Sequence, residues 1–180
     1  MLNSYFAKMR SVTKSPPPVH AKEILWSWIG AFLGISAVGI VNERIVSGSA
    51  LVMIIGSFGA SAVLIYGAIK SPLAQPRNLL GGHVLSAIIG VFCCRLFPQT
   101  SWLAGALAVA TAIAVMHATR TLHPPGGATA LIAVIGGDKI HTLGYLYALV
   151  PAGAGALVML LIALIVNNLP KDRRYPEFWF

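Results

Sequence analysis

Two short segments combine helix-breaking residues with groups that could bind an anion. The first is HPPGG at 123–127, followed closely by the hydroxyl of Thr129. Proline has no amide hydrogen and suits the first turn of a helix, so Pro125 predicts a helix start. The amides of Gly126 and Gly127 would then point out of that start, where the helix dipole favours negative charge. The segment therefore predicts one side of an anion site.

A second segment, GSFGASA at 56–62, has a similar composition. Its GASA string matches the GATA string of the first segment, so that a serine corresponds to Thr129. We therefore predict that Gly59, Ala60 and Ser61 form the other side of the anion site. Two alternatives stay open. Such strings can recur by chance in helices rich in small residues, or the two segments can cross and pack, with glycines providing room.

Cationic side chains lie next to these segments in the sequence. His123 directly precedes the prolines. Arg77 and His83 flank the start of the apolar stretch 79–97, which lies between the two segments in the sequence. Ionisable groups inside a membrane are usually functional, so we include all three in the predicted anion site. The alternatives are histidines that only make packing hydrogen bonds and an arginine that anchors the chain at lipid headgroups.

The composition is that of an integral membrane protein. Hydrophobic residues make up 57% of the chain and charged residues 10%, against about a quarter charged in soluble domains. Six stretches can cross a bilayer as helices, and the second and fifth contain the interrupting segments. The expected membrane segments are 24–43, 48–69, 79–97, 102–119, 125–137 and 143–167. We therefore predict an all-α membrane protein with one transmembrane domain, 24–169.

The positions of the interruptions suggest an internal repeat. Each lies in the middle one of three segments, in halves spanning 24–97 and 102–167. An odd number of segments per half makes the second half run upside down, which is an inverted repeat. Transporters built in this way place their site at the membrane midplane, between interrupted helices in corresponding positions.

Basic residues indicate the orientation. The net charge is +8, but the charges flank apolar segments, which points to a lipid bilayer rather than to nucleic acid as the partner. With six segments, ten of the 13 Lys and Arg residues fall on one side. The positive-inside rule makes that side cytoplasmic, so the basic segment 1–23 and the tail 170–180 are both expected in the cytoplasm.

Some classes of site are excluded. The interiors of the six segments contain no Asp or Glu, so a carboxylate cation site, a carboxylate proton relay and a di-iron centre have no ligands. Cys93 and Cys94 are adjacent and cannot supply spaced metal ligands. We expect neither a metal nor another cofactor, and an anion fits best.

Three motifs in order resemble the HPP family of integral membrane proteins. They are GSFGASA at 56–62, SPLAQPRN at 71–78 with GGH at 81–83, and HPPGGATA at 123–130. The resemblance covers about residues 24–179. It implies a helical membrane protein of bacteria and plastids, with plant and cyanobacterial members linked to nitrite transport. We therefore predict a non-enzymatic carrier or channel for a small inorganic anion, most simply nitrite, in a bacterial plasma membrane.

Two other functions stay open. Ser61 lies in a GxSx string, and His83, His117 or His123 could activate it in an intramembrane serine hydrolase. Such an enzyme requires the serine and a histidine within hydrogen-bond reach. The third function is a structural or sensory module without transport. The sequence leaves the oligomeric state open, a homo-oligomer included.

Overall fold

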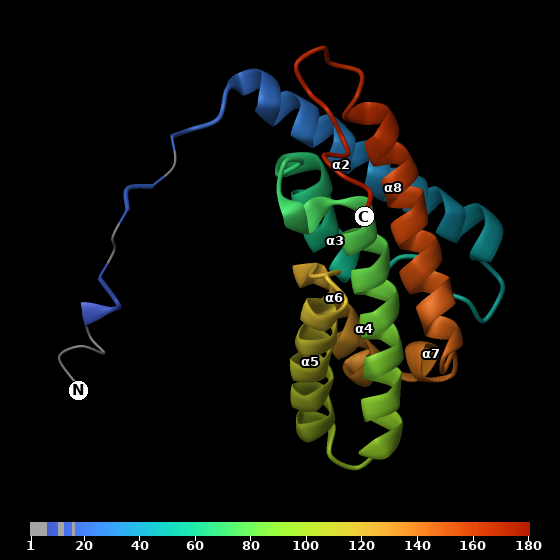
Figure 1. Cartoon of the computed structure of the whole chain (residues 1–180). Helices are drawn as coiled ribbons and strands as arrows, with labels where there is room; N and C mark the ends of the chain where they lie inside the picture. Colours follow the sequence, from blue (N-terminus) through green and yellow to red (C-terminus); the bar gives the residue numbers. More distant parts are fainter. Residues whose placement is uncertain (1–6, 11–12, 16) are drawn as a thin grey trace.

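The computed structural model describes residues 7–10, 13–15 and 17–180, and every regular element in that part of the chain is a helix. The predicted N-terminal segment 1–23 thus lies partly outside the described residues. Figure 1 shows the arrangement. The elements are α2 (Ala21–Val41), η1 (Asn42–Val46), α3 (Ser57–Ala62), η2 (Val63–Gly67), η3 (Pro72–Ala74), α4 (Pro76–Leu96), α5 (Ser101–Ala118), α6 (Pro124–Ile135), α7 (Asp138–His141), η4 (Ala148–Gly153) and α8 (Ala154–Val166).

Helix lengths confirm the all-α membrane class and correct the number of full segments. Within the described residues, four helices are long and apolar enough to cross a membrane: Ala21–Val46, Pro76–Leu96, Ser101–Ala118 and Ala148–Val166. The second and fifth predicted segments hold only the shorter apolar helices Ser57–Gly67 and Pro124–Ile135. Six full crossings and the inverted repeat are therefore not confirmed. The reason is local: residues 51–55 adopt no helix before α3, and α6 has only 12 residues.

The start of α6 follows from its prolines. The helix begins at Pro124, one residue before the predicted start. His123 has extended backbone angles (φ −139°, ψ 104°), as expected for a residue before proline. The helix ends at Ile135, and Gly137 then takes a positive φ of 74°, which glycine adopts without strain. Proline and glycine thus set the length of this half-span helix.

Small residues let α4 and α6 pack closely. A methyl group added at Gly90 would lie 2.5 Å from the Ala130 carbonyl oxygen, and one at Gly126 would lie 2.7 Å from the Gly82 carbonyl oxygen. The backbones therefore approach each other without side chains between them, as is common between helices in lipid. This close approach brings the HPPGG and GGH motifs together.

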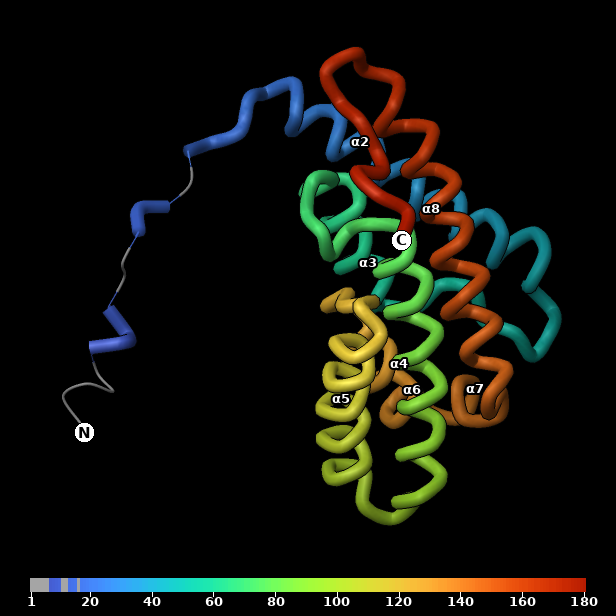
Figure 2. Tube along the Cα trace, viewed as in Figure 1, coloured from blue at the N-terminus to red at the C-terminus, as the bar shows by residue number. Residues whose placement is uncertain are grey.

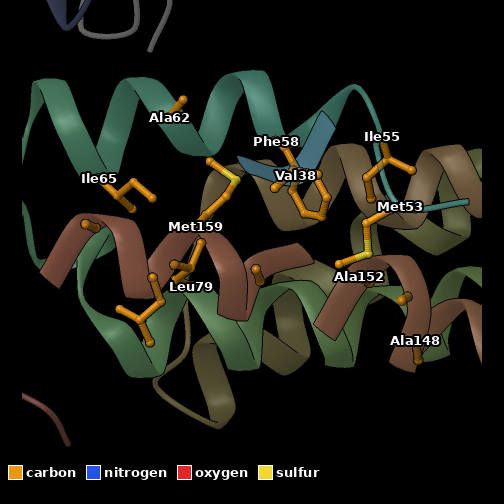
Figure 3. Close-up of a cluster of buried hydrophobic side chains, with 14 of the residues drawn as sticks. Val38, Met53, Ile55, Phe58, Ala62, Ile65, Leu79, Ala148, Ala152 and Met159 are labelled. Carbon is orange, nitrogen blue, oxygen red and sulfur yellow. The ribbon is translucent and has the colours of Figure 1, made fainter. Parts of the chain in front are cut away.

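A second set of contacts joins α2, η2 and α8. The Tyr66 ring lies across Gly30 of α2, where an added methyl group would be 2.6 Å from a ring carbon. The Tyr66 hydroxyl donates to the Met159 carbonyl at 3.0 Å. Buried apolar side chains fill the space between α3, α4 and α8, among them Phe58, Leu79 and Met159 (Figure 3). This core holds α3 in place.

Both ends of the helical region lie on one face of the molecule. Lys22 Nζ lies 2.8 Å from an Asp172 carboxylate oxygen, and Arg173 forms an ion pair of 3.0 Å with Glu23. Figure 2 traces the C-terminal tail from α8 back to the start of α4. There the Tyr175 hydroxyl donates to the Ala74 carbonyl at 2.7 Å. The predicted cytoplasmic identity of this face stays a prediction.

Candidate functional site

Five polar side chains meet where α3, α4 and α6 come together. None is more than 1% exposed. We call this group the histidine–serine cluster; its members are Ser57, Ser61, His83, His123 and Thr129. Polar groups buried in this way must find hydrogen-bond partners inside the protein. The cluster therefore has a defined internal structure.

The glycine and proline motifs position the two histidines. A methyl group at Gly82 would lie 2.5 Å from Cβ of His123, so only glycine allows His123 to approach α4. His83 is the next residue on α4. As a result the two imidazole rings have centroids 5.1 Å apart at an angle of 60°. The edge of the Phe58 ring closes one side of His83, with centroids 5.2 Å apart.

The Ser61 hydroxyl connects the two histidines. Its oxygen lies 2.7 Å from Nε2 of His83 and 2.9 Å from Nε2 of His123. The far nitrogen of each ring also has a partner. Nδ1 of His83 lies 2.7 Å from the Thr129 hydroxyl, and Nδ1 of His123 lies 2.8 Å from the Leu73 carbonyl oxygen. The two rings and the serine thus form a continuous chain.

The Leu73 carbonyl fixes the direction of this chain for neutral rings. A carbonyl only accepts, so Nδ1 of His123 carries the hydrogen and its Nε2 accepts from Ser61. The Ser61 oxygen then accepts from Nε2–H of His83, whose bare Nδ1 accepts from Thr129. The Ser57 oxygen, at 2.9 Å, and the Pro125 carbonyl oxygen, at 3.2 Å, are alternative acceptors for the single Thr129 hydrogen. His123, Ser61, His83 and Thr129 are thus linked in one direction by these bonds.

Four residues of the predicted anion site lie outside the histidine–serine cluster. They are the ones whose backbone amides were expected to bind the anion at a helix start. Gly59 and Ala60 are exposed on the outer side of α3. The amide of Gly126 donates to the His123 carbonyl at 2.7 Å, so the expected free amide at this position was wrong. Gly127 faces α5 and lines an apolar cavity of about 530 Å³. The cluster therefore uses side chains where the sequence predicted backbone amides.

Arg77 has a different position from the one predicted. Its Nε donates to the Arg120 carbonyl at 3.0 Å, and its terminal nitrogen donates to the Thr119 carbonyl at 3.3 Å. Arg77 therefore satisfies carbonyls at the end of α5, where a cation also complements the helix dipole. It lies beside the cluster and not within it.

Two cavities with basic residues lie at opposite ends of α4. The one at its start has about 470 Å³ and is lined by Arg77, His117 and Arg120, among others. The one at its end has about 480 Å³ and is lined by Arg95 and His141, with Cys94 beside them. At 1.5 Å per helical residue, His83 lies about 9 Å from Arg77 and about 18 Å from Arg95 along the helix axis. The cluster thus lies between the two cavities.

Sequence reasoning missed some of these groups. Ser57 precedes Ser61 by one helical turn. The signal for Ser57 was this spacing, because two residues one turn apart share a face once 57–62 is recognised as a helix. The Leu73 carbonyl has no side-chain signal, and the Arg95 cavity depends on where α7 packs. In the part of the chain that the structure describes, no three His, Cys, Asp or Glu residues are grouped to hold a metal ion.

Comparison with known proteins identifies the family. The model of the HPP transmembrane region matches residues 16–176. The chain belongs to the HPP family. Two transmembrane proteins of Dictyostelium discoideum are similar to this HPP protein, at 47% identity over 180 residues and 44% over 181 residues. Each comparison covers 98% of this chain, which spans 57% and 63% of the lengths of those relatives. No solved structure matches it.

Proposed function

We propose that this HPP protein transports a small inorganic anion, nitrite in the first instance, and that the histidine–serine cluster binds it. The observation that carries the proposal is the burial of two histidines with three hydroxyls where two half-length helices meet. Burying so many polar groups in apolar surroundings costs free energy, and intramembrane ionisable residues usually have a function. Transport folds place their sites at such meetings of short helices.

The cluster offers donors of the kind that an anion needs. Nε2 of His83 and Nε2 of His123 lie within 2.9 Å of the Ser61 oxygen. A nitrite oxygen entering between the rings would accept from Nε2–H of His83 and from the Ser61 hydroxyl, and also from Nε2 of His123 once that ring is protonated. No carboxylate bonds to the cluster among the described residues, so no carboxylate there repels an anion. Phe58 limits the space beside His83 to a small ligand.

The two basic cavities suggest how an anion reaches the cluster. Arg95 at one end of α4 and Arg77 and Arg120 at the other raise the local concentration of anions. The cluster residues themselves are closed to solvent in this conformation. Opening requires α3 or α6 to move away from α4. We place the face with Arg77 and both chain ends in the cytoplasm.

We keep the inverted repeat as part of this proposal. What supports it is the matched position of the two half-length helices, Ser57–Gly67 and Pro124–Ile135, in the second and fifth segments. Ser61 and Thr129, which correspond in the two sequence strings, both lie in the cluster. Each half would then contribute one hydroxyl to the same site.

Purified protein in liposomes tests the proposal. Nitrite uptake down its gradient is measured against empty liposomes, with nitrate, chloride and formate as competing anions. We expect uptake well above the empty liposomes and at least a tenfold loss with His83→Gln or Thr129→Val. His20→Gln and Thr111→Val, at exposed positions, are the matched controls. Uptake equal to that of empty liposomes for all four anions would refute transport.

One observation favours a second candidate, an intramembrane serine hydrolase. Ser61 lies 2.9 Å from Nε2 of His123, whose other nitrogen is oriented by the Leu73 carbonyl. A nucleophile, a base and an acceptor that orients the base are thus connected by consecutive hydrogen bonds. The serine is fully buried, which disfavours access of a bulky ester or peptide. A fluorophosphonate probe that labels the protein but not Ser61→Ala would support this candidate; an unlabelled, folded protein would count against it.

A further inference from the structure

We infer that the histidine–serine cluster also carries a proton, so that each anion crosses the membrane together with one H⁺. This inference rests on the anion transport proposed above and names its coupling ion. It comes from the hydrogen-bond chain of single direction that runs from Thr129 through His83 and Ser61 to His123.

The chain has the geometry of a proton relay. Its three links measure 2.7, 2.7 and 2.9 Å from Thr129 to His123. His83, Ser61 and His123 each accept one hydrogen bond and donate another, so a proton can pass between them without movement of a heavy atom. The members come from three different helices, α3, α4 and α6. Movement of one helix would therefore break the chain.

The proton count along the chain balances. A proton that reaches the Thr129 hydroxyl lets Thr129 pass its own hydrogen to Nδ1 of His83. His83 then gives its Nε2 hydrogen to Ser61, which gives its own to Nε2 of His123. Both hydroxyls end with one hydrogen, His83 has changed tautomer, and His123 has become a cation. The net change is one H⁺ taken up.

The positions of the rings set the stoichiometry at one. The ring centroids lie 5.1 Å apart and both rings are closed to solvent, so a second positive charge would be repelled by the first. A single charge on the pair matches the single negative charge of nitrite. Together they form a neutral unit, which crosses an apolar interior at far lower cost than either ion alone.

The surroundings contain no competing charge close to the rings. From α3 the facing groups are Ser57, Ser61 and the Phe58 ring. From the segment before η4, Tyr147 donates its hydroxyl to the Thr129 carbonyl at 3.0 Å. From α4 itself, Arg77 is directed to the end of α5. In the described part of the chain, no Lys, Arg, Asp or Glu side chain bonds to the cluster, so the two histidines are the groups that take up the proton.

The tail and α5 add nothing that titrates near neutral pH at the cluster. The Tyr175 hydroxyl of the tail donates to the Ala74 carbonyl, next to the Leu73 carbonyl that receives His123. From α5, Met116 contacts Ser86 through its sulfur at 3.6 Å. The His123 end of the chain therefore ends at a neutral backbone group.

Coupled flux in liposomes tests the inference. Protein is reconstituted with a pH-sensitive dye inside, the membrane potential is clamped to zero with potassium and valinomycin, and nitrite is added outside. We expect internal acidification with about one H⁺ per nitrite above the leak of empty liposomes. An acid exterior should drive nitrite uphill, by about tenfold for one pH unit at one-to-one coupling.

The outcomes separate the inference from the proposed function. Nitrite uptake above empty liposomes that is indifferent to the pH gradient overturns proton coupling and leaves transport standing. No uptake at all overturns both. Ser61→Ala should lose uphill uptake, whereas Ser61→Thr, which keeps the hydroxyl, should retain part of it. If Ser61→Ala does not fold, the gradient experiment on the unchanged protein still decides.

Discussion

Nδ1 of His123 lies 2.8 Å from the Leu73 carbonyl oxygen, and this contact sets the direction of the hydrogen bonds that link His123, Ser61 and His83. Because the carbonyl only accepts, His123 must carry its hydrogen on Nδ1 and His83 on Nε2 when both rings are neutral. Nitrogen-15 NMR of labelled histidine in the purified protein distinguishes these tautomers. We expect one ring of each type; two rings of the same tautomer would contradict the proposed direction.

Ser61→Ala should destabilise the protein as well as impair transport. It leaves Nε2–H of His83 and the bare Nε2 of His123 unpaired in a buried site, at a cost of about 1–3 kcal/mol. Thermal unfolding in detergent measures the loss. Ser27→Ala, whose half-buried hydroxyl only bonds to the Glu23 carbonyl of its own helix, is the matched control and should change little. An equal loss in both variants would argue against a special role of the cluster.

Gly82→Ala should disrupt the site through one methyl group. The new carbon would lie 2.5 Å from Cβ of His123, so the residue must move and its bond to Ser61 must lengthen or break. We expect nitrite uptake to fall at least tenfold. Gly39→Ala, at a helical position with open space around it, should leave uptake unchanged and slightly favour helix α2. Full uptake by Gly82→Ala would show that the ring position is not critical.

Tyr175→Phe should loosen the tail over the start of α4. The buried hydroxyl donates to the Ala74 carbonyl, and its loss should cost about 1 kcal/mol. Hydrogen exchange of residues 70–75 should increase, whereas Tyr145→Phe, an exposed position, should have no such effect. Unchanged exchange in Tyr175→Phe would mean that the tail is held elsewhere.

The same tyrosine predicts a pH dependence. Burial raises the pKa of Tyr175 above its ordinary value of about 10. A raised folded-state pKa means that the stabilisation is fully present below pH 10 and is lost as the pH rises further. The stability difference between the unchanged protein and Tyr175→Phe should therefore be constant from pH 6 to about 9 and shrink above that. A difference that grows with alkaline pH would contradict this.

The two ion pairs on the tail should differ in importance. Arg173 is buried, pairs with Glu23 at 3.0 Å and donates to the Tyr66 carbonyl at 2.9 Å. Arg173→Met should cost about 3 kcal/mol, because it leaves buried partners without their donor. Lys22 and Asp172 form an exposed pair, in which Lys22 lowers the pKa of the carboxyl group. Lys22→Met should leave the melting temperature almost unchanged.

The sequence predicted the helix start at HPPGG, because the effect of proline on the backbone is local. It also grouped Ser61, His83, His123 and Thr129 in one site, because polar residues in an apolar segment are conspicuous, and the structure brings these side chains together. It did not predict which way the residues of the second segment face. The helix begins at Ser57, so Ser57 and Ser61 turn inward one helical turn apart, whereas Gly59 and Ala60 between them turn outward.

Other features depended on tertiary structure. The amide of Gly126 is used by the chain just before the helix, which no residue pattern shows. Arg77 meets the end of α5 only after the two helices have packed. The shortness of the second and fifth helices was suggested by their breakers, but charge-free stretches of sufficient length were still counted as full segments. Length and hydropathy alone therefore did not show that these two segments hold only short helices.

Nitrite uptake into liposomes by the unchanged protein, Gly82→Ala and Gly39→Ala tests most directly whether the cluster carries transport, because the methyl group added at Gly82 meets His123 and the one added at Gly39 meets open space. The account predicts uptake far above empty liposomes for the unchanged protein and Gly39→Ala, and at least a tenfold lower rate for folded Gly82→Ala. Uptake by the unchanged protein no faster than in empty liposomes would contradict it.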